Sequence, residues 1–262
     1  MQRQRLAVAT GNFSQPLKAS LVTASQMKAQ GVQLDARSEV SPTSFSDTGK
    51  REFLNLLKEL NLSVASLSFP TRRNFYDQDQ LEARVTATKA AMQLARNLQS
   101  GILTIRIGTL PEDLESLEAI LLRDVLNDLA RHGNHVGATI SITPSRDSPQ
   151  KMKTFLSSIT EGPLGIDFDP ATFVMGGTSP VSALRELHNY VCHYRIRDGI
   201  KDMDGIGKEV PVGRGEVDWN EFLPLIDETA YQGWLTIDRT QGEDKITDSA
   251  NTIQFLKQTM ML

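Results

Sequence analysis

The chain has 262 residues, of which 39% are hydrophobic and 23% are charged, and its formal net charge is −4. This length can bury a sizeable core, while one cysteine and four histidines exclude a disulfide framework, a multi-cysteine metal centre and a histidine-rich metal cluster. The slightly acidic charge gives no electrostatic basis for nucleic-acid binding, and no apolar run approaches the roughly 18 residues of a membrane span, so we expect a cytoplasmic protein with neither a nucleic-acid nor a membrane partner.

Short apolar runs recur along the whole chain and mark the expected strands. They are mostly unbroken and rich in β-branched residues, which is typical of parallel strands that are covered on both faces. The eight runs are Leu6–Ala9, Val32–Leu34, Leu62–Leu67, Gly101–Ile107, Val136–Ile142, Leu164–Phe168, Val191–Ile196 and Trp234–Ile237.

A longer amphipathic segment follows each apolar run and predicts a helix. We expect Gly31 and Gly133 to end the first and fourth helices, and Asp218 with Glu221 resembles a capping box at the start of the seventh. The eight predicted helices are Leu17–Gln30, Phe53–Leu60, Asp77–Asn97, Pro111–His132, Pro149–Ile159, Pro180–Asn189, Asp218–Glu228 and Lys245–Gln258.

Eight strand–helix units in about 250 residues are the signature of a (β/α)₈ TIM barrel. No linker or change of composition divides the chain, so we expect residues 1–262 to form one domain. A doubly wound open sheet also alternates strands and helices, but no phosphate-binding glycine fingerprint follows the first strand. The barrel is therefore the favoured fold, and it places functional groups at the carboxyl ends of its strands.

Arginine outnumbers lysine by 17 to 11, and nine arginines stand in or just after the expected strand ends or in the loop after the seventh strand. They are Arg37, Arg72, Arg73, Arg106, Arg146, Arg195, Arg197, Arg214 and Arg239. Because a guanidinium matches carboxylate and phosphate groups, this cluster either binds an anionic ligand or forms a structural network with nearby aspartates, and the sequence leaves both interpretations open. No lysine stands at a strand end, which argues against a Schiff-base aldolase.

Four segments of the chain resemble one known family. Gly165–Pro170, Tyr194–Asp198, Val212–Trp219 (Val-Gly-Arg-Gly-Glu-Val-Asp-Trp) and Tyr231–Asp238 are similar to motifs of the xylose isomerase-like TIM barrels. This family contains sugar isomerases and epimerases, with inosose dehydratase and endonuclease IV as relatives. The resemblance extends over nearly the whole chain and implies the same barrel fold.

The resemblance also implies one divalent metal, held by Glu, Asp, His and Glu from strands 5 to 8. The matching positions are Thr143, Asp169, Arg195 and Asp238, so one ligand is kept, one is shortened and two are lost. Because Mg²⁺ and Mn²⁺ need anionic oxygen ligands and a guanidinium would repel them, we expect no metal cofactor. Arg195 is expected instead to replace the charge of the metal and to pair with Asp169 and Asp238.

The family enzymes use two carboxylates to remove and return a proton beside a carbonyl group. Thr143 cannot act as such a base, so we expect Asp238 to be one partner, with either Asp35 or Asp167 as the other. His193 stands two residues before Arg195 and on the same face of its strand. It is either a residual metal ligand or ligand contact, or a hydrogen-bonded histidine of the barrel interior.

Two functions remain in view. The first is a sugar isomerase or epimerase that acts on a sugar phosphate or sugar acid without a metal, with Asp169, Asp238 and Arg195 as catalytic residues. Its expected substrate contacts are Arg37, Arg72, Arg73, Arg106, Thr143, His193 and Arg214. The second is a non-catalytic ligand-binding or interaction protein of the same descent, in which salt bridges of Arg195 fill the old site.

A DNA-repair endonuclease is disfavoured, because that chemistry needs several histidine and carboxylate metal ligands. The expected partner is therefore a small anionic sugar, and the sequence is compatible with a homo-oligomer.

Overall fold

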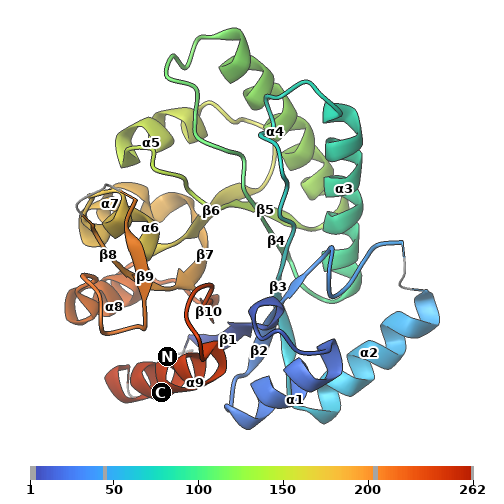
Figure 1. Cartoon of the computed structure of the whole chain (residues 1–262). Helices are drawn as coiled ribbons and strands as arrows, with labels where there is room; N and C mark the ends of the chain where they lie inside the picture. The colour runs from blue at the N-terminus through green and yellow to red at the C-terminus, as the bar shows by residue number, and fades with distance from the viewer. Residues whose placement is uncertain (1–3, 44–45, 203–205, 261–262) are drawn as a thin grey trace.

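A computed structural model describes residues 4–43, 46–202 and 206–260. Parallel strands close into a barrel in the order β1-β10-β7-β6-β5-β4-β3-β2, and helices surround it (Figure 1). Closure is direct, because β1 pairs with β2 on one side and with β10 on the other. The chain is a single (β/α)₈ barrel, as predicted, and not an open sheet. The barrel strands are β1 (Arg5–Ala9), β2 (Gly31–Asp35), β3 (Ser63–Ser68), β4 (Ile102–Ile105), β5 (Thr139–Ile142), β6 (Leu164–Phe168), β7 (Val191–Ile196) and β10 (Trp234–Ile237).

The helices agree with the predicted segments in place but differ at their ends. Serine caps decide two of the starts: the side chain of Ser46 accepts a hydrogen bond from the amide of Gly49, and Ser116 does the same for Ala119. The helices are α1 (Leu17–Gln26), α2 (Asp47–Glu59), α3 (Leu81–Asn97), α4 (Leu117–Val136), α5 (Pro149–Ser157), α6 (Pro170–Met175), α7 (Pro180–Leu187), α8 (Trp219–Glu228) and α9 (Lys245–Thr259), with short 3₁₀ turns at Thr10–Asn12 and His188–Tyr190. The sequence patterns did not indicate α6.

Gly133 does not end the fourth helix, and this expectation is corrected. The helix continues to Val136 and is capped by Gly137, whose φ of 76° is left-handed and whose amide donates to the carbonyl of Gly133. A Cβ atom at Gly133 would collide with the carbonyl oxygen of Ala138. This glycine therefore lets the backbone that follows the helix pass close to its last turn. Gly31 likewise begins β2, several residues after α1 has ended.

The barrel interior is polar. Large apolar side chains of the strands, such as Phe168 and Tyr194, are fully buried in the hydrophobic core cluster. The buried polar side chains at the strands include Gln33, Ser66, Thr104, Ser141, Asp167, His193, Arg195 and Thr236. Hydrogen bonds and charge pairing, rather than apolar packing alone, must therefore organise the centre of the barrel.

A bulge in β7 sets the register of this polar interior. Ile166 pairs with Val191 and Asp167 pairs with His193, so Cys192 is the extra residue. The thiol of Cys192 lies 3.0 Å from the hydroxyl of Ser141 instead of facing the helices, as strict alternation would require. Burial raises the pKa of this thiol to about 12, so it stays protonated and is not a nucleophile.

A small antiparallel hairpin, β8 (Asp198–Ile200) with β9 (Lys208–Val210), follows β7 and was not predicted. Figure 1 shows it beside α6. The buried carboxylate of Asp198 anchors the loop after it, accepting hydrogen bonds from the amides of Gly199, Gly213, Gly215 and Val217 and from the indole of Trp219. A side chain at Gly215 would collide with this carboxylate. None of the described helices is long and apolar enough to cross a membrane.

The Asp198→Asn variant is expected to lose about 2–3 kcal/mol of unfolding free energy, because an amide NH₂ cannot accept hydrogen bonds and leaves buried N–H donors unsatisfied. Urea denaturation measures this loss. The matched control is Asp218→Asn at the exposed cap of α8, where asparagine is an equally good cap and the midpoint should stay unchanged. Equal midpoints for both variants would contradict the anchoring role of Asp198.

Candidate functional site

A cavity of about 220 Å³ opens at the carboxyl ends of the barrel strands. Its wall is polar and carries two carboxylates, Asp35 and Asp238, together with the guanidinium groups of Arg106 and Arg195. The remaining lining residues are Ala9, Gly11, Asn12, Gln33, Ser68, Phe69, Pro70, Thr104, Ile105, Thr143 and Thr240. This is the face on which the barrel fold places its ligands.

A second cavity of about 400 Å³ lies next to the first. The two share Arg106, Thr143 and Thr240, so they are neighbouring parts of one mouth. We call them the first and the second cavity.

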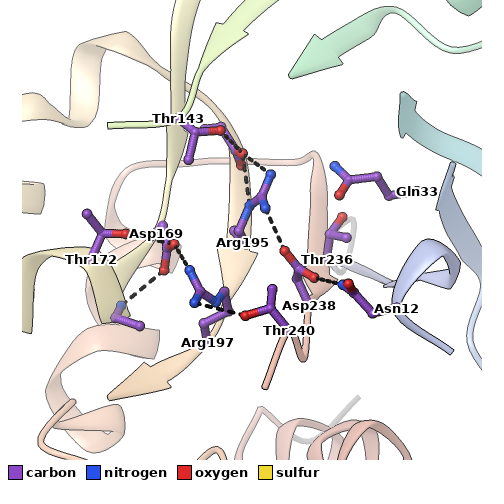
Figure 2. A network of polar contacts seen from close by, with 12 residues as sticks. Asn12, Gln33, Thr143, Asp169, Thr172, Arg195, Arg197, Thr236, Asp238 and Thr240 are labelled. Atoms are coloured by element: carbon purple, nitrogen blue, oxygen red, sulfur yellow. Dashed lines mark hydrogen bonds and ion pairs between the residues drawn. The ribbon is translucent and has the colours of Figure 1, made fainter. Parts of the chain in front are cut away.

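Arg195 lies at the floor of the first cavity and is 7% exposed. Its Nε and Nη2 atoms donate to Oδ2 of Asp167 at 3.0 and 2.7 Å, and its Nη1 atom donates to Oδ2 of Asp238 at 2.5 Å. Figure 2 shows the guanidinium of Arg195 between Thr143 and Asp238. The pairing with Asp238 agrees with the sequence prediction, but the second partner is Asp167 and not Asp169.

Asp169 turns away from Arg195 because it caps α6. Its carboxylate accepts hydrogen bonds from the amide of Ala171 and the hydroxyl of Thr172, and Nη1 of Arg197 lies 2.5 Å from its Oδ2 atom. Asp169 is fully buried, and it is absent from the wall of either cavity. A direct catalytic contact of Asp169 with a ligand is therefore not supported by its position.

Asp167 is the centre of the buried network. Besides Arg195, the hydroxyl of Thr143 donates to it at 2.8 Å and Nδ1 of His193 lies 2.7 Å from its Oδ1 atom. Burial by itself raises the pKa of Asp167, but the positive charge of Arg195 and the contact with His193 outweigh it and hold the pKa well below the usual range. Asp167 is thus a saturated carboxylate and not an available base, which leaves Asp35 as the second carboxylate on the cavity wall.

His193 lies below the cavity and is fully buried. Its Nε2 atom is 3.1 Å from the hydroxyl of Ser66 and 2.9 Å from that of Thr236. Since the ionised Asp167 can only accept, Nδ1 of His193 carries the donated proton. Of the two interpretations of His193, the structure agrees with a hydrogen-bonded histidine of the barrel interior and not with a ligand contact.

A second ionic cluster stands beside the first. Glu209 of β9 accepts from Nε and Nη2 of Arg197, from Nη1 of Arg239, and from the amide and hydroxyl of Thr240. Burial tends to lower the pKa of Arg197, but Asp169, Asp238 and Glu209 raise it above its ordinary value. Glu209, which the sequence analysis did not select, therefore fixes the loop that carries Thr240 into both cavities.

The four residues that the resemblance matches to the metal ligands of the family do not fit a divalent cation. Thr143 offers only a neutral hydroxyl, and one oxygen each of Asp169 and Asp238 lies 2.5 Å from a guanidinium nitrogen. The permanent charge of Arg195 would repel the ion. Within the part of the chain that the structure describes, no group of three His, Cys, Asp or Glu side chains comes close enough to hold a metal ion.

The other predicted arginines lie mostly outside the two cavities. Arg73 pairs with Asp77 and Asp79 at the surface, and Arg37 stacks on the ring of Phe69 at 4.3 Å. The residues of the predicted contact set that line neither cavity are Arg37, Arg72, Arg73, His193 and Arg214. Arg106 and Thr143 line both cavities.

Two amide side chains on the cavity wall were not selected from the sequence. Nδ2 of Asn12 donates to Oδ1 of Asp238 at 2.5 Å, and Nε2 of Gln33 donates to the hydroxyl of Ser66 at 2.8 Å. Figure 2 shows Asn12 next to Asp238. Asn12 could have been found from its place just after the first strand, whereas Gln33 lies in the middle of β2. Side-chain amides, like carboxylates, can hydrogen-bond the hydroxyl groups of a sugar.

Comparisons with known proteins agree on the fold. The sequence model of the family described as "Xylose isomerase-like TIM barrel" matches residues 21–259. An inosose dehydratase of Clostridium beijerinckii is 25% identical over 146 residues, which are 46% of this chain and 47% of that protein, so the match spans about half its length.

Two solved structures illustrate the likeness of the folds. A xylose isomerase domain protein from Planctomyces limnophilus has a TM-score of 0.87 and 23% identity, covering 98% of this chain and 97% of that one. A D-tagatose 3-epimerase-like protein has a TM-score of 0.80 and 16% identity, with the same coverage. At these identities the likeness establishes the fold alone.

Proposed function

The chain belongs to the xylose isomerase-like TIM barrel family, and on that premise we propose that it is an isomerase or epimerase of an anionic sugar that works without a divalent metal. The observation that carries this proposal is Arg195, which pairs with Asp167 and Asp238 at the floor of the first cavity. The resemblance described above matches this residue to a metal ligand of the family. A fixed positive charge thereby takes the place that a metal ion has in the family.

Arg195 has donors to spare for a ligand. A guanidinium has five N–H groups, and three of them make the bonds to Asp167 and Asp238, so two make no hydrogen bond with any described residue. Burial tends to lower the pKa of Arg195, but the surrounding aspartates raise it above its ordinary value. It stays charged at any working pH and is suited to bind the oxygen of a carbonyl group on which negative charge develops.

The reaction needs two carboxyl groups and no co-reactant. Asp238 takes the proton from the carbon beside the carbonyl group, the electrons of that C–H bond form an enolate, and Arg195 holds the enolate oxygen. For the epimer, Asp35, the other carboxyl group of the first cavity, gives its own proton to the opposite face of the same carbon, and proton exchange with water restores both groups. For the isomer, Asp238 returns its proton to the former carbonyl carbon while the proton of the neighbouring hydroxyl group moves to the enolate oxygen. Loss of a hydroxyl group from the same enolate would instead be a dehydration, the reaction in the name of the Clostridium relative.

Hydrogen exchange tests this proposal directly. Sugar phosphates and sugar acids incubated with the protein in D₂O should incorporate deuterium at the carbon beside the carbonyl group, as followed by ¹H NMR. Exchange by the wild-type protein supports the enzyme. Binding without exchange by any sugar supports the non-catalytic alternative, which the occupation of both oxygens of Asp238 by Arg195 and Asn12 favours.

The protein is expected to be indifferent to metals. Elemental analysis should find no stoichiometric Mn, Mg or Zn, and neither EDTA nor added Mn²⁺ should change the melting temperature or the exchange rate. The reason is that Arg195 would repel an ion at this site. One equivalent of bound metal that EDTA removes together with the activity would overturn the proposed role of Arg195.

A further inference from the structure

We propose that the second cavity is an oxyanion subsite, in which Arg106 and Arg146 bind the phosphate or carboxylate group of the substrate while the first cavity takes its hydroxylated chain. The assignment of the sugar part rests on the proposed function. The assignment of the anion rests on the charges around the second cavity.

The lining of the second cavity is cationic and hydroxylic. It contains three arginines, Arg106, Arg146 and Arg197, and no carboxylate among its described residues. The hydroxyl-bearing residues Thr143, Ser145, Thr172 and Thr240 and the amide of Gln241 complete the polar part. Guanidinium and hydroxyl groups are the donors that bind phosphate and carboxylate.

The charge of Arg106 is not paired within the part of the chain that the structure describes. Its guanidinium makes no hydrogen bond or ion pair with any described residue, although the pairs of Arg195 and Arg197 lie close by. The surrounding protein lowers the pKa of Arg106, and the positive charges of Arg195 and Arg197 lower it further, against a smaller opposing effect of Asp169 and Asp238. An anion bound at Arg106 would relieve this repulsion between like charges.

The other two arginines of the second cavity, Arg197 and Arg146, differ in the contacts that they make. Arg197 forms ion pairs with Asp169 and Glu209, and these two carboxylates neutralise its charge. Nη2 of Arg146 donates to the carbonyl oxygen of Ile206 at 2.7 Å, and this bond holds its guanidinium at the edge of the second cavity. Both Arg106 and Arg146 line the second cavity, and by this position we assign the bound anion to them.

The first cavity differs in charge from the second, and this difference sets the direction of the ligand. Its two arginines, Arg106 and Arg195, are balanced by Asp35 and Asp238, whose carboxylates accept hydrogen bonds from hydroxyl groups. The second cavity has no carboxylate among its described residues and therefore favours the anion. Arg106 lines both cavities and lies at their junction. The substrate class is thus a polyhydroxylated carbonyl compound with its phosphate or carboxylate group at the end remote from Asp238.

The experiment measures binding of inorganic phosphate, a sugar phosphate, a sugar acid and a neutral sugar alcohol by calorimetry, with the wild-type protein and the variants Arg106→Gln, Arg146→Gln and Arg72→Gln. Arg72 is an exposed arginine that lines neither cavity and is the matched control. Replacing Arg106 or Arg146 should lower the affinity for inorganic phosphate by about tenfold or more, as expected for removal of a charged hydrogen-bond donor. Arg72→Gln should leave this affinity unchanged. A melting temperature of Arg106→Gln equal to or above that of the wild type shows that the variant folds.

The outcomes separate the two proposals. Phosphate binding that depends on Arg106 and Arg146, with no deuterium exchange in any sugar, supports the subsite and overturns the isomerase. Deuterium exchange in a sugar whose affinity is unaffected by both variants overturns the subsite and leaves the isomerase standing. The sugar phosphate and the sugar acid distinguish the two anions, and binding of neither, nor of inorganic phosphate, by the wild type overturns the subsite.

Discussion

Replacing Arg195 by methionine is expected to remove about 3–5 kcal/mol of unfolding free energy, the usual cost of taking one partner out of a buried ion pair. Asp167 is fully buried and Asp238 almost so, and both would lose the guanidinium that neutralises them. Since domains are stable by only about 5–15 kcal/mol, urea denaturation at pH 7 should show a large shift of the midpoint. A loss below about 1 kcal/mol would mean that the network is not held together by Arg195.

The pH dependence of this loss identifies its cause. In the wild type the pKa of Asp167 is lowered by folding, so this group stabilises the protein above the unfolded pKa of about 3.9 and the contribution is lost as the pH falls. Without Arg195, burial would raise the same pKa, and Asp167 would destabilise the fold at neutral pH. The deficit of the variant should therefore shrink as the pH is lowered. The double variant Arg195→Met with Asp167→Asn should recover part of the lost stability, because it removes the unpaired charge.

The Asp238→Asn variant is expected to lose about 10²–10⁴-fold in the rate of exchange and turnover, the usual contribution of a positioned general base. An amide cannot take the proton, but it keeps the shape of the side chain at the wall of the first cavity. The rate of deuterium incorporation measures the loss, and calorimetry with the sugar ligand should show that binding is largely retained.

Two comparisons make this result specific. Asp35→Asn should also slow the reaction if Asp35 exchanges the proton at the other side of the ligand, whereas Asp218→Asn, which changes an exposed cap of α8, should not. An Asp238→Asn protein with the wild-type exchange rate would assign the base to another residue.

The barrel could be predicted from the sequence because its strands are the chain's short apolar runs. Burial on both faces gives each of them a recognisable pattern, and the count of eight leads to closure. The hairpin of β8 and β9 was not predicted, because strands of three residues such as Asp198–Ile200 are too short to show a periodic pattern. Helix ends depended on caps such as Ser46 and Ser116, which the apolar pattern does not mark.

The site was predicted in part of its composition and in one of the two ion pairs of Arg195, the pair with Asp238. Thr143, Arg195 and Asp238 do come together at the first cavity, as their places at strand ends implied. The choice of Asp167 over Asp169 as the partner of Arg195 depends on backbone geometry: Asp169 lies beyond β6 at the cap of α6, where its carboxylate faces Arg197. The arginines of longer loops, such as Arg72 and Arg214, could not be placed, because a loop fixes no direction for its side chains.

The closure of the barrel also determines the order in which this centre is completed during synthesis. β10 pairs with both β1 and β7 and carries Thr236, while Asp238 follows it. Until this last strand has left the ribosome, the nascent chain has two unpaired sheet edges and only half of the acidic partners of Arg195. Unpaired sheet edges of this kind promote aggregation, and chaperones counteract it. The strand that finishes the hydrogen-bonded sheet is thus also the one that neutralises the charge at its centre.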